Sequence, residues 1–421
     1  MHAIFASYDY GNDISGVSSW LVRLLPLLRA RGVDAEAHLF RIGDGGGATA
    51  RALQHAGVPV KSAPWPEYSE AGTRQCLEWL GPRLPDVYVP NCIVPAYHAV
   101  RFIRPAGVPA VGVLHTDQNT SDALLAEFGA GPAERRVNAW AVVSSRLETL
   151  ARQRVAPDVV VARIPCGVPA PDQQACAASG RFRIVYAGRL TEDAKRIGDV
   201  TRALIAAAER WPDVEGWIIG EGPERPNLER LVAASPARSR VRLLGRRPVD
   251  EVQHLMAQCQ AYVLLSDYEG LPVSMLEAMA VGVVPIVHRE AGGVAEAVTN
   301  ERNGFIVGDR SEGFLRAVAA LRADAARWSA MSSAARRTIT EGYLVSAGAD
   351  AWHDLLGQVA AARATRTAWT PPRRIALPPH NPILGWFDQR RPSFARRCWT
   401  QTRMTLGRYR SLLVRGKSPK P

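Results

Sequence analysis

Two series of alternating strands and helices, separated by one irregular stretch, constrain the fold of this chain more than any other feature. In the first series, apolar runs indicate strands at 2–7, 34–40, 87–90, 110–114 and 139–143, and a helical period spans 17–29. Strands that alternate with helices of this length are typical of βαβ units and parallel sheets. The first series therefore predicts a Rossmann-like domain over residues 1–170.

The second series follows a proline- and glycine-containing stretch, 164–180, which we interpret as a linker. Its strands are expected at 183–188, 216–219, 241–244, 261–265 and 284–288, and its helices at 197–210, 228–233, 250–257 and 273–280. This predicts a second Rossmann-like domain over 171–345, then a helix at 346–362 that crosses back to the first domain. In such α/β folds ligands bind at the carboxyl ends of the strands, so a central cleft is the expected site.

The positive charge belongs to one end of the chain. The net charge is +12, yet residues 363–421 hold 14 of the 52 basic residues and one of the 40 acidic ones. The preceding 362 residues are nearly neutral, which argues against nucleic acid as a partner. No signal-peptide pattern and no apolar run of about 18 residues is found, so a cytoplasmic protein is expected.

The basic tail, 363–421, mixes arginines with aromatic residues. One interpretation is a solvated extension. The other is an arm that binds the anionic inner face of a membrane, where each basic residue contributes about 1 kcal/mol.

Metal and dinucleotide sites are not expected. The six cysteines form no CxxC and no zinc-type cluster with histidine, so scattered reduced thiols are the simplest account. Gly11 and Gly16 bracket a loop before the first helix, but the spacing is not G-x-G-x-x-G, which disfavours a nicotinamide-dependent oxidoreductase.

The sequence DYEGLPVSMLE, at 267–277, places a loop and a helix directly after a strand. Pro272 suits the first helical position, and the amides of Val273 and Ser274 would then form an anion site at the helix N-terminus. Glu269 in the loop and Glu277 one turn into the helix are carboxylates that could each hold vicinal hydroxyls of a sugar. We favour this interpretation over solvated surface acids.

Two cations follow the first strand of the second series. Arg189 and Lys195 precede the helix at 197–210, and Lys195 is one of only two lysines in the first 362 residues. A cation near a helix N-terminus is unfavourable unless an anion binds there. Together they could neutralise a pyrophosphate leaving group.

His115 ends a strand at the expected cleft edge. A single histidine in such a place is more often structural than catalytic, but its position facing the other domain's anion site makes it a candidate.

The ordered motifs GRLTEDAK, GEGP, LLGRRP, EGLPVSMLEAM, AGGVAEAV and NGFIV resemble those of retaining nucleotide-sugar glycosyltransferases of the GT-B fold, family 4. The first half matches more loosely, through SGVSSW, GVPAVGVLHTD, AVVSSRLETL and IPCGVP. The resemblance covers about residues 2–360.

The resemblance implies a role for each matching residue on the donor diphosphate. Arg189 and Lys195 would bind it and stabilise the departing nucleotide. Val273 and Ser274 would cap a phosphate, and Gly16 would bring backbone close to it.

The resemblance also implies contacts to the sugars. Glu269 would bind hydroxyls of the donor sugar in a pocket completed by Gly270, Leu271 and Pro272. Glu277 would hold the ribose.

The remaining implied positions are His115 beside the transferred sugar and Arg247, within 246–248, near the base. The chain departs from the family pattern at two places: Ser15 precedes Gly16 where paired glycines are usual, and Cys166 stands where asparagine is common.

The predicted function is transfer of a sugar from a nucleotide-diphosphate sugar to a glycan or lipid-linked glycan, with retention of configuration and without a metal or other cofactor. A nucleotide-sugar epimerase or a glycan phosphorylase is the alternative within the same fold. A binding or scaffold protein with a degenerate site is the third.

Overall fold

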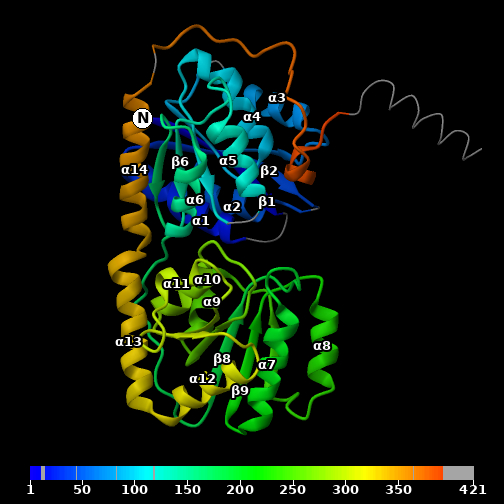
Figure 1. Ribbon diagram of the computed structural model, residues 1–421, viewed down its shortest axis with the longest axis vertical. Coiled ribbons are helices and arrows are strands. Elements are labelled where there is room, and N and C mark those ends of the chain that lie inside the picture. Colours follow the sequence, from blue (N-terminus) through cyan, green and yellow to red (C-terminus); the bar gives the residue numbers. More distant parts are fainter. Residues whose placement is uncertain (11–14, 44, 82, 117–118, 364, 392–421) are drawn as a thin grey trace, which may run out of the picture.

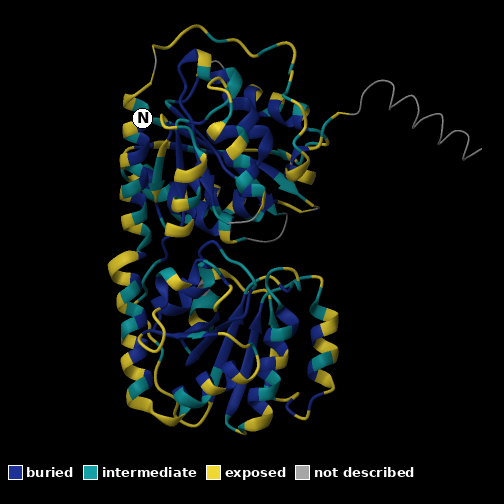
Figure 2. Cartoon of the chain, viewed as in Figure 1, coloured by how far each residue is buried: buried dark blue, intermediate teal, exposed yellow. Residues whose placement is uncertain are grey.

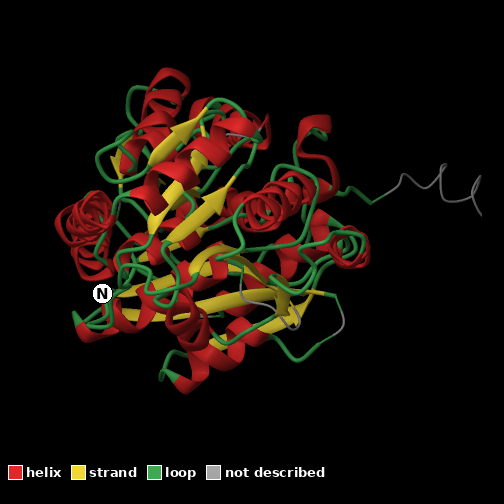
Figure 3. Ribbon diagram, turned by 90° about the horizontal axis from the view of Figure 1, so that it is seen from below, coloured by secondary structure: helices red, strands yellow, loops and turns green. Residues whose placement is uncertain are grey.

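The computed structural model describes residues 1–10, 15–43, 45–81, 83–116, 119–363 and 365–391. Within them the chain forms two α/β domains stacked along the long axis of the molecule (Figure 1). The strands of each domain lie between helices, as the view from below shows (Figure 3). Burial follows the same layers: the strands are largely buried, and the outer faces of the helices are exposed (Figure 2).

The N-terminal domain contains one extended parallel sheet. Its strands are β1 (His2–Tyr10), β2 (Asp34–Ile42), β3 (Val60–Pro64), β4 (Val87–Pro90), β5 (Val111–Leu114), β6 (Ala139–Val142) and β7 (Val160–Arg163). The order is β3-β2-β1-β4, and bridges from Tyr88 to Ala110 and from Asn91 to Val113 continue it into β5-β6-β7.

Helices cover this sheet. They are α1 (Gly16–Ala30), α2 (Ala48–His55), α3 (Ser69–Leu80), α4 (Val94–Ile103), α5 (Asn119–Leu125) and α6 (Ser145–Arg154). The apolar residues of α1 recur at helical spacing, and Trp20, Leu21, Leu24 and Leu28 are all buried. Its N-cap is Ser15, whose Oγ accepts a hydrogen bond from the amide of Ser18 at 3.2 Å.

The C-terminal domain has a parallel sheet of order β10-β9-β8-β11-β12-β13. Its strands are β8 (Phe182–Ala187), β9 (Val214–Ile219), β10 (Val241–Gly245), β11 (Ala261–Leu264), β12 (Val284–His288) and β13 (Phe305–Val307). Its helices are α7 (Ile197–Arg210), α8 (Arg225–Ala233), α9 (Val249–Met256), α10 (Val273–Ala280), α11 (Val294–Ala297), α12 (Glu312–Ala323) and α13 (Ala325–Gly342).

Both sheets share one strand order, in which the strand order reverses beside the first strand of the domain. A crevice opens at this reversal, at the carboxyl ends of β1 and β4 in one domain and of β8 and β11 in the other. The loops that follow these four strands therefore face the space between the domains.

The expected α/β class with two Rossmann-like domains is confirmed. Helices α7 and α10 and strands β4 and β12 have the predicted bounds, whereas β1 runs three residues further than predicted, to Tyr10. Strands β3 and β7 were not predicted. Both lie at sheet edges and are partly exposed, so neither has a continuous apolar run.

The chain crosses between the domains at two adjacent segments. The amide of Val168 donates to the carbonyl of Tyr343 at 2.9 Å, and the amide of Val345 donates to the carbonyl of Val168 at 3.1 Å. Helix α14 (Val345–Ala361) then packs along the N-terminal domain, where Trp352 contacts Phe5 and Trp20 at ring-centroid distances of 5.8 and 5.6 Å. These segments fix the hinge side of the cleft.

Residues 365–391 form a largely exposed strap over the N-terminal domain, held by hydrogen bonds from Arg366 to the carbonyl of Pro85 and from Trp369 to the carbonyl of Phe102 (Figure 1). Its short 3₁₀ helix η3 (Pro382–Asp388) buries Leu384 and Asp388. Asp388 accepts hydrogen bonds from Ser69 Oγ at 2.7 Å and Arg390 Nη2 at 2.8 Å, and lies 3.4 Å from His98 Nε2. The rest of the predicted tail, 392–421, lies outside the described residues.

Candidate functional site

A cavity of about 670 Å³ lies between the carboxyl edges of the two sheets. It is lined from the N-terminal domain by the start of α1 and the ends of β1, β4 and β5, and from the other domain by the loops after β8, β9 and β11. All twelve residues predicted for the site line it: Gly16, His115, Arg189, Lys195, Arg247, Glu269, Gly270, Leu271, Pro272, Val273, Ser274 and Glu277. Residues 11–14 of the predicted glycine loop lie outside the described part of the chain.

The loops after β8 and β11 meet through an ion pair. Lys195 Nζ donates to Glu269 Oε1 at 2.6 Å, and Ser266 Oγ donates to the same oxygen at 2.8 Å. The two charged side chains are 22% and 12% exposed, so water screens the pair only partly. The sequence placed both residues in the cleft but did not predict that they bond to each other.

The backbone around Lys195 holds an uncommon conformation. Ala194 and Arg196, on either side, have φ angles of 43° and 51°, in the left-handed region that non-glycine residues seldom adopt. The carbonyl of Ala194 accepts a hydrogen bond from the amide of Asp267 at 2.8 Å, which ties this turn to the loop after β11. Such outliers are frequent at ligand sites, where the surrounding structure enforces them.

Arg189 lies directly after β8 and is exposed to the cavity. Within the described residues its guanidinium forms no ion pair, unlike Lys195. Its backbone carbonyl accepts a hydrogen bond from Tyr186 OH at 2.9 Å, which fixes the chain at this turn. Of these two cations, Lys195 is therefore paired with a carboxylate, whereas Arg189 is available to an anion.

Helix α10 begins at the cavity wall. Pro272, predicted at the first helical position, is instead the N-cap, with ψ of 107°, and Val273 begins the helix. Ser274 Oγ is 2.8 Å from Tyr262 OH, so the first turn is also tied to β11. A Cβ placed on Gly16 would lie 3.9 Å from Val273 Cγ2, which shows that the N-termini of α1 and α10 face each other. The positive ends of two helix dipoles thus converge on the cavity.

Glu277 lies in the second turn of α10 and forms an ion pair with Arg23 of α1. The two side chains are 11% and 12% exposed and belong to different domains. Sequence reasoning missed Arg23, because an arginine within an apolar helical repeat gives no sign of a partner 254 residues away.

His115 follows β5 and is held by polar and aromatic neighbours. Its Nε2 is 3.0 Å from Asn91 Oδ1, and its ring packs edge-on against Trp20 at 5.0 Å. Its Nδ1 is 3.8 Å from Cys166 Sγ, the residue that departs from the family pattern. Burial lowers the pKa of His115 to about 4, because desolvation disfavours the imidazolium, so the ring is neutral at pH 7.

The two domains touch at His115. A Cβ on Gly270 would overlap the carbonyl oxygen of His115, so only glycine allows this approach. Arg247 follows β10 at the cavity wall and is exposed. It donates to the carbonyl of Leu244 at 3.0 Å and to Glu251 Oε1 at 3.1 Å.

The strap also reaches the cleft. Leu384 of η3 lines the cavity near Leu124 of α5, although its side chain was predicted to belong to a tail outside the fold. Apolar side chains from Val94, Val113 and Leu384 therefore form part of the wall on the side of the N-terminal domain.

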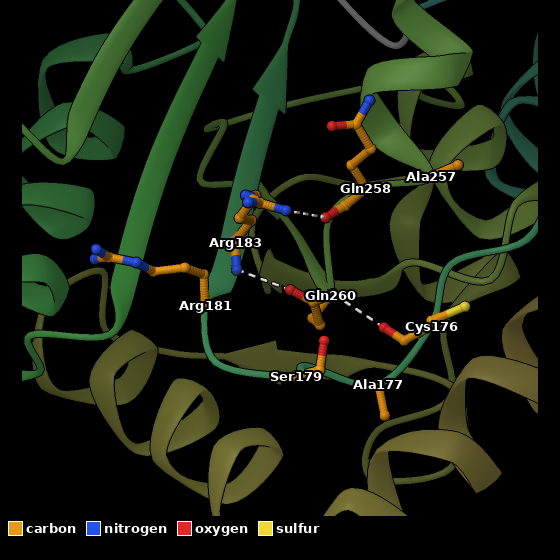
Figure 4. A pocket seen from close by; sticks show the side chains of 8 residues that line it. All are labelled: Cys176, Ala177, Ser179, Arg181, Arg183, Ala257, Gln258 and Gln260. Atoms are coloured by element: carbon orange, nitrogen blue, oxygen red, sulfur yellow. Dashed lines mark hydrogen bonds between the residues drawn. The ribbon is translucent and has the colours of Figure 1, made fainter.

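A smaller cavity of about 250 Å³ lies elsewhere in the C-terminal domain (Figure 4). It is lined by the linker and by residues at the amino ends of β8 and β11. Gln260 accepts a hydrogen bond from the amide of Arg183 at 2.8 Å and donates to the carbonyl of Cys176 at 2.9 Å. These bonds hold the linker against the sheet, at the edge opposite the one where α/β sheets bind ligands.

Among the described residues no cluster of three or more His, Cys, Asp or Glu side chains could hold a metal ion. In the same part of the chain, no helix combines the length and apolar character that crossing a bilayer requires.

Comparison with known proteins finds similarity over the C-terminal domain. Residues 181–324 match the family described as Glycosyl transferases group 1. The amylovoran biosynthesis glycosyltransferase AmsK of Erwinia amylovora is 31% identical over 146 residues, which are 33% of this chain and 35% of AmsK. The lipopolysaccharide core biosynthesis glycosyltransferase LpsE of Rhizobium meliloti is 32% identical over 155 residues, 36% of this chain and 44% of LpsE. The match thus spans less than half the length of either relative.

Solved structures extend the likeness to both domains. HepE of Anabaena, in complex with UDP and glucose, superposes with a TM-score of 0.70 at 19% identity, covering 85% of this chain and all of that one. The predicted GT-B fold is therefore confirmed.

Proposed function

We propose that this protein is a retaining glycosyltransferase that moves a sugar from a nucleotide-diphosphate sugar to a glycan or lipid-linked glycan. The observation that carries the proposal is the convergence of Arg189, Lys195 and the N-terminus of α10 on one cleft that is also lined by Glu269 and Glu277. This arrangement suits a ligand with a diphosphate between two sets of hydroxyl groups.

The diphosphate binds between the domains. Arg189 and the amides of Val273 and Ser274 contact its oxygens, and Gly16 brings the start of α1 close to it. Lys195 reaches the phosphate while it keeps its bond to Glu269. As the bond to the sugar breaks, negative charge grows on the leaving phosphate, and these fixed donors stabilise it without reorganising. The two cations support transfer that needs no metal.

The two sugars bind on either side of the diphosphate. Glu269 Oε1 accepts hydrogen bonds from Lys195 and Ser266, which leaves Oε2 to accept from hydroxyls of the donor sugar. Gly270, Leu271 and Pro272 complete this pocket. Glu277 accepts hydrogen bonds from the ribose hydroxyls, and the exposed Arg247 lies near the base.

His115, neutral at pH 7, lies beside the transferred sugar and contributes a hydrogen bond rather than a charge. The acceptor hydroxyl attacks on the face that the diphosphate leaves, and a phosphate oxygen takes its proton. Retention of configuration follows from this same-face attack. The names of AmsK and LpsE support an acceptor of the surface-polysaccharide class.

The test begins with binding and ends with stereochemistry. UDP-, GDP- and ADP-sugars are screened by thermal shift, where a ligand at 100 times its Kd stabilises by about 2.7 kcal/mol. The donor that binds is then incubated with glycan and lipid-linked acceptors, and the anomeric configuration of the product is read by NMR. Retained configuration is expected. Epimerised or phosphorolysed donor without transfer would favour the alternative enzymes, and binding without any turnover would favour a degenerate protein.

Contact with a membrane is a separate proposal that rests on residues 392–421, which carry eight basic residues and no acidic one. In the part of the tail before them, Arg363 and Arg366 pair with Asp86, and Arg390 pairs with Asp388. Deletion of 392–421 is expected to reduce binding to vesicles that contain phosphatidylserine. Unchanged binding would contradict the proposal.

A further inference from the structure

The ion pair between Arg23 and Glu277 joins the two domains at the site. Arg23 belongs to α1 of the N-terminal domain, and its Nη2 donates to Glu277 Oε1 in α10 of the C-terminal domain. Glu277 lines the cavity, whereas Arg23 does not, so the arginine stands behind the carboxylate as seen from the ligand space. The two side chains are only 12% and 11% exposed.

The two oxygens of the Glu277 carboxylate can therefore bond to different partners. Oε1 is occupied by Arg23, which leaves Oε2 for a group in the cavity. The other terminal nitrogen of Arg23, Nη1, is buried and has no hydrogen-bond partner within the described residues. Glu277 is thus the acceptor that this part of the chain offers to the guanidinium.

The pair is not explained by stability alone. Replacement of a buried ion pair by apolar residues is often neutral or stabilising, and most of the buried side chains of α1 are apolar. A carboxylate held in one orientation next to a ligand does require such a partner, because an unpaired buried charge is costly.

We propose that Arg23 is a positioning residue of the nucleotide site. From the opposite domain it holds Glu277 in the orientation that accepts ribose hydroxyls, so that tight binding of a ribonucleotide requires a closed cleft. The inference rests on the role of Glu277 in the proposed function. It adds that a residue outside the nucleotide-binding domain determines preference for ribose over deoxyribose.

The test compares ribonucleotides with their deoxy counterparts. UDP, GDP and ADP, and the 2′,3′-dideoxy form of whichever binds, are titrated by calorimetry into the full chain and into Arg23→Ala, Arg23→Lys and Glu277→Gln. Arg23→Ala is expected to weaken the ribonucleotide about tenfold and the dideoxynucleotide less than twofold, because only the former uses Glu277. Arg23→Lys, which keeps the charge, should recover part of the loss.

The double variant Arg23→Ala/Glu277→Gln completes a double-mutant cycle for this ion pair. It should bind the ribonucleotide no more weakly than Glu277→Gln alone, since both changes remove one interaction. Arg31→Ala is the matched control, because it breaks another arginine ion pair at the end of α1, with Asp350 at 2.7 Å, away from the cavity. If Arg23→Ala does not fold, Arg23→Met keeps the packing of the aliphatic stem.

The outcomes separate the two proposals. Equal weakening of both nucleotides by Arg23→Ala, or additive losses in the double variant, would overturn the role of Arg23 while the proposed function stands. If Glu277→Gln weakens ribonucleotide binding but Arg23→Ala does not, the role of Arg23 is likewise overturned while the proposed function stands. Absence of binding by any nucleoside diphosphate to the unaltered chain would instead remove the proposed function itself.

Discussion

The two domains share a strand order but hold their site residues in different ways. In the C-terminal domain, Lys195 and Glu269 follow neighbouring strands and bond to each other at 2.6 Å. In the N-terminal domain, His115 is buried against Trp20 of α1, beside Cys166 of the linker, and is hydrogen-bonded to Asn91. One half of the site is thus organised by charge within a compact motif, and the other by burial among distant segments. The variants below test this contrast in order of expected effect.

The largest effect is expected from Lys195→Ala. The change removes the donor to Glu269 and the proposed contact to the leaving phosphate, so kcat/KM should fall by about 10²–10³-fold. Initial rates of transfer measure it. Lys61→Ala is the control, since Lys61 is the other lysine among the described residues and its side chain is 46% exposed. A loss of less than threefold for Lys195→Ala would mean that charge does not organise this half of the site.

Gly270→Ala tests the point at which the halves meet. The added methyl group would overlap the carbonyl oxygen of His115, and the domains must separate to accommodate it. Because a misplacement of about 1 Å can cost 10²-fold in rate, kcat should fall by about that factor, and the Kd for the nucleotide should rise as well, because Arg23 and Glu277 move apart with the domains. Gly357→Ala in α14, where a Cβ meets no neighbour, is the matched control. A weakened nucleotide with an unchanged kcat would contradict the expected effect.

The contrast also explains which features could be predicted from sequence. The loop DYEGLP and helix α10 were predictable, because a strand, a proline and a helix start are close in the chain and each has a local physical cause. Arg23 was not, because its partner is 254 residues away. The strap was not predicted either: Leu384 is followed by a basic, aromatic sequence that indicates a solvated tail, and its burial depends on a surface formed by other helices. Contacts between residues far apart in the chain could not be predicted from the sequence.

Leu384→Ala tests the contribution of the strap. Loss of a buried leucine side chain is expected to cost about 2–4 kcal/mol of unfolding free energy in the N-terminal domain. Because Leu384 also lines the cavity, KM for the acceptor should rise while the Kd for the nucleotide is unchanged. Ile383→Ala is the matched control, since the adjacent isoleucine is 58% exposed. If the two substitutions have equal effects in denaturant titration and in kinetics, the strap does not contribute to the stability of the domain or to the site.

The smallest effect concerns pH. The pKa of His115 is about 4 in the fold, because burial disfavours the charged ring, against about 6.5 in an unfolded chain. Between these values the unfolded state binds more protons, so His115 lowers stability as pH falls from about 6.5 to 4 and contributes no pH dependence above that window. His115→Gln keeps a side chain able to bond to Asn91 but cannot titrate, so its unfolding midpoint should depend less on pH there. His353→Gln, on the exposed side of α14, controls for loss of an imidazole as such. If the two profiles remain parallel from pH 4 to 7, burial does not lower the pKa of His115, and the proposed contrast between the two halves of the site fails at this residue.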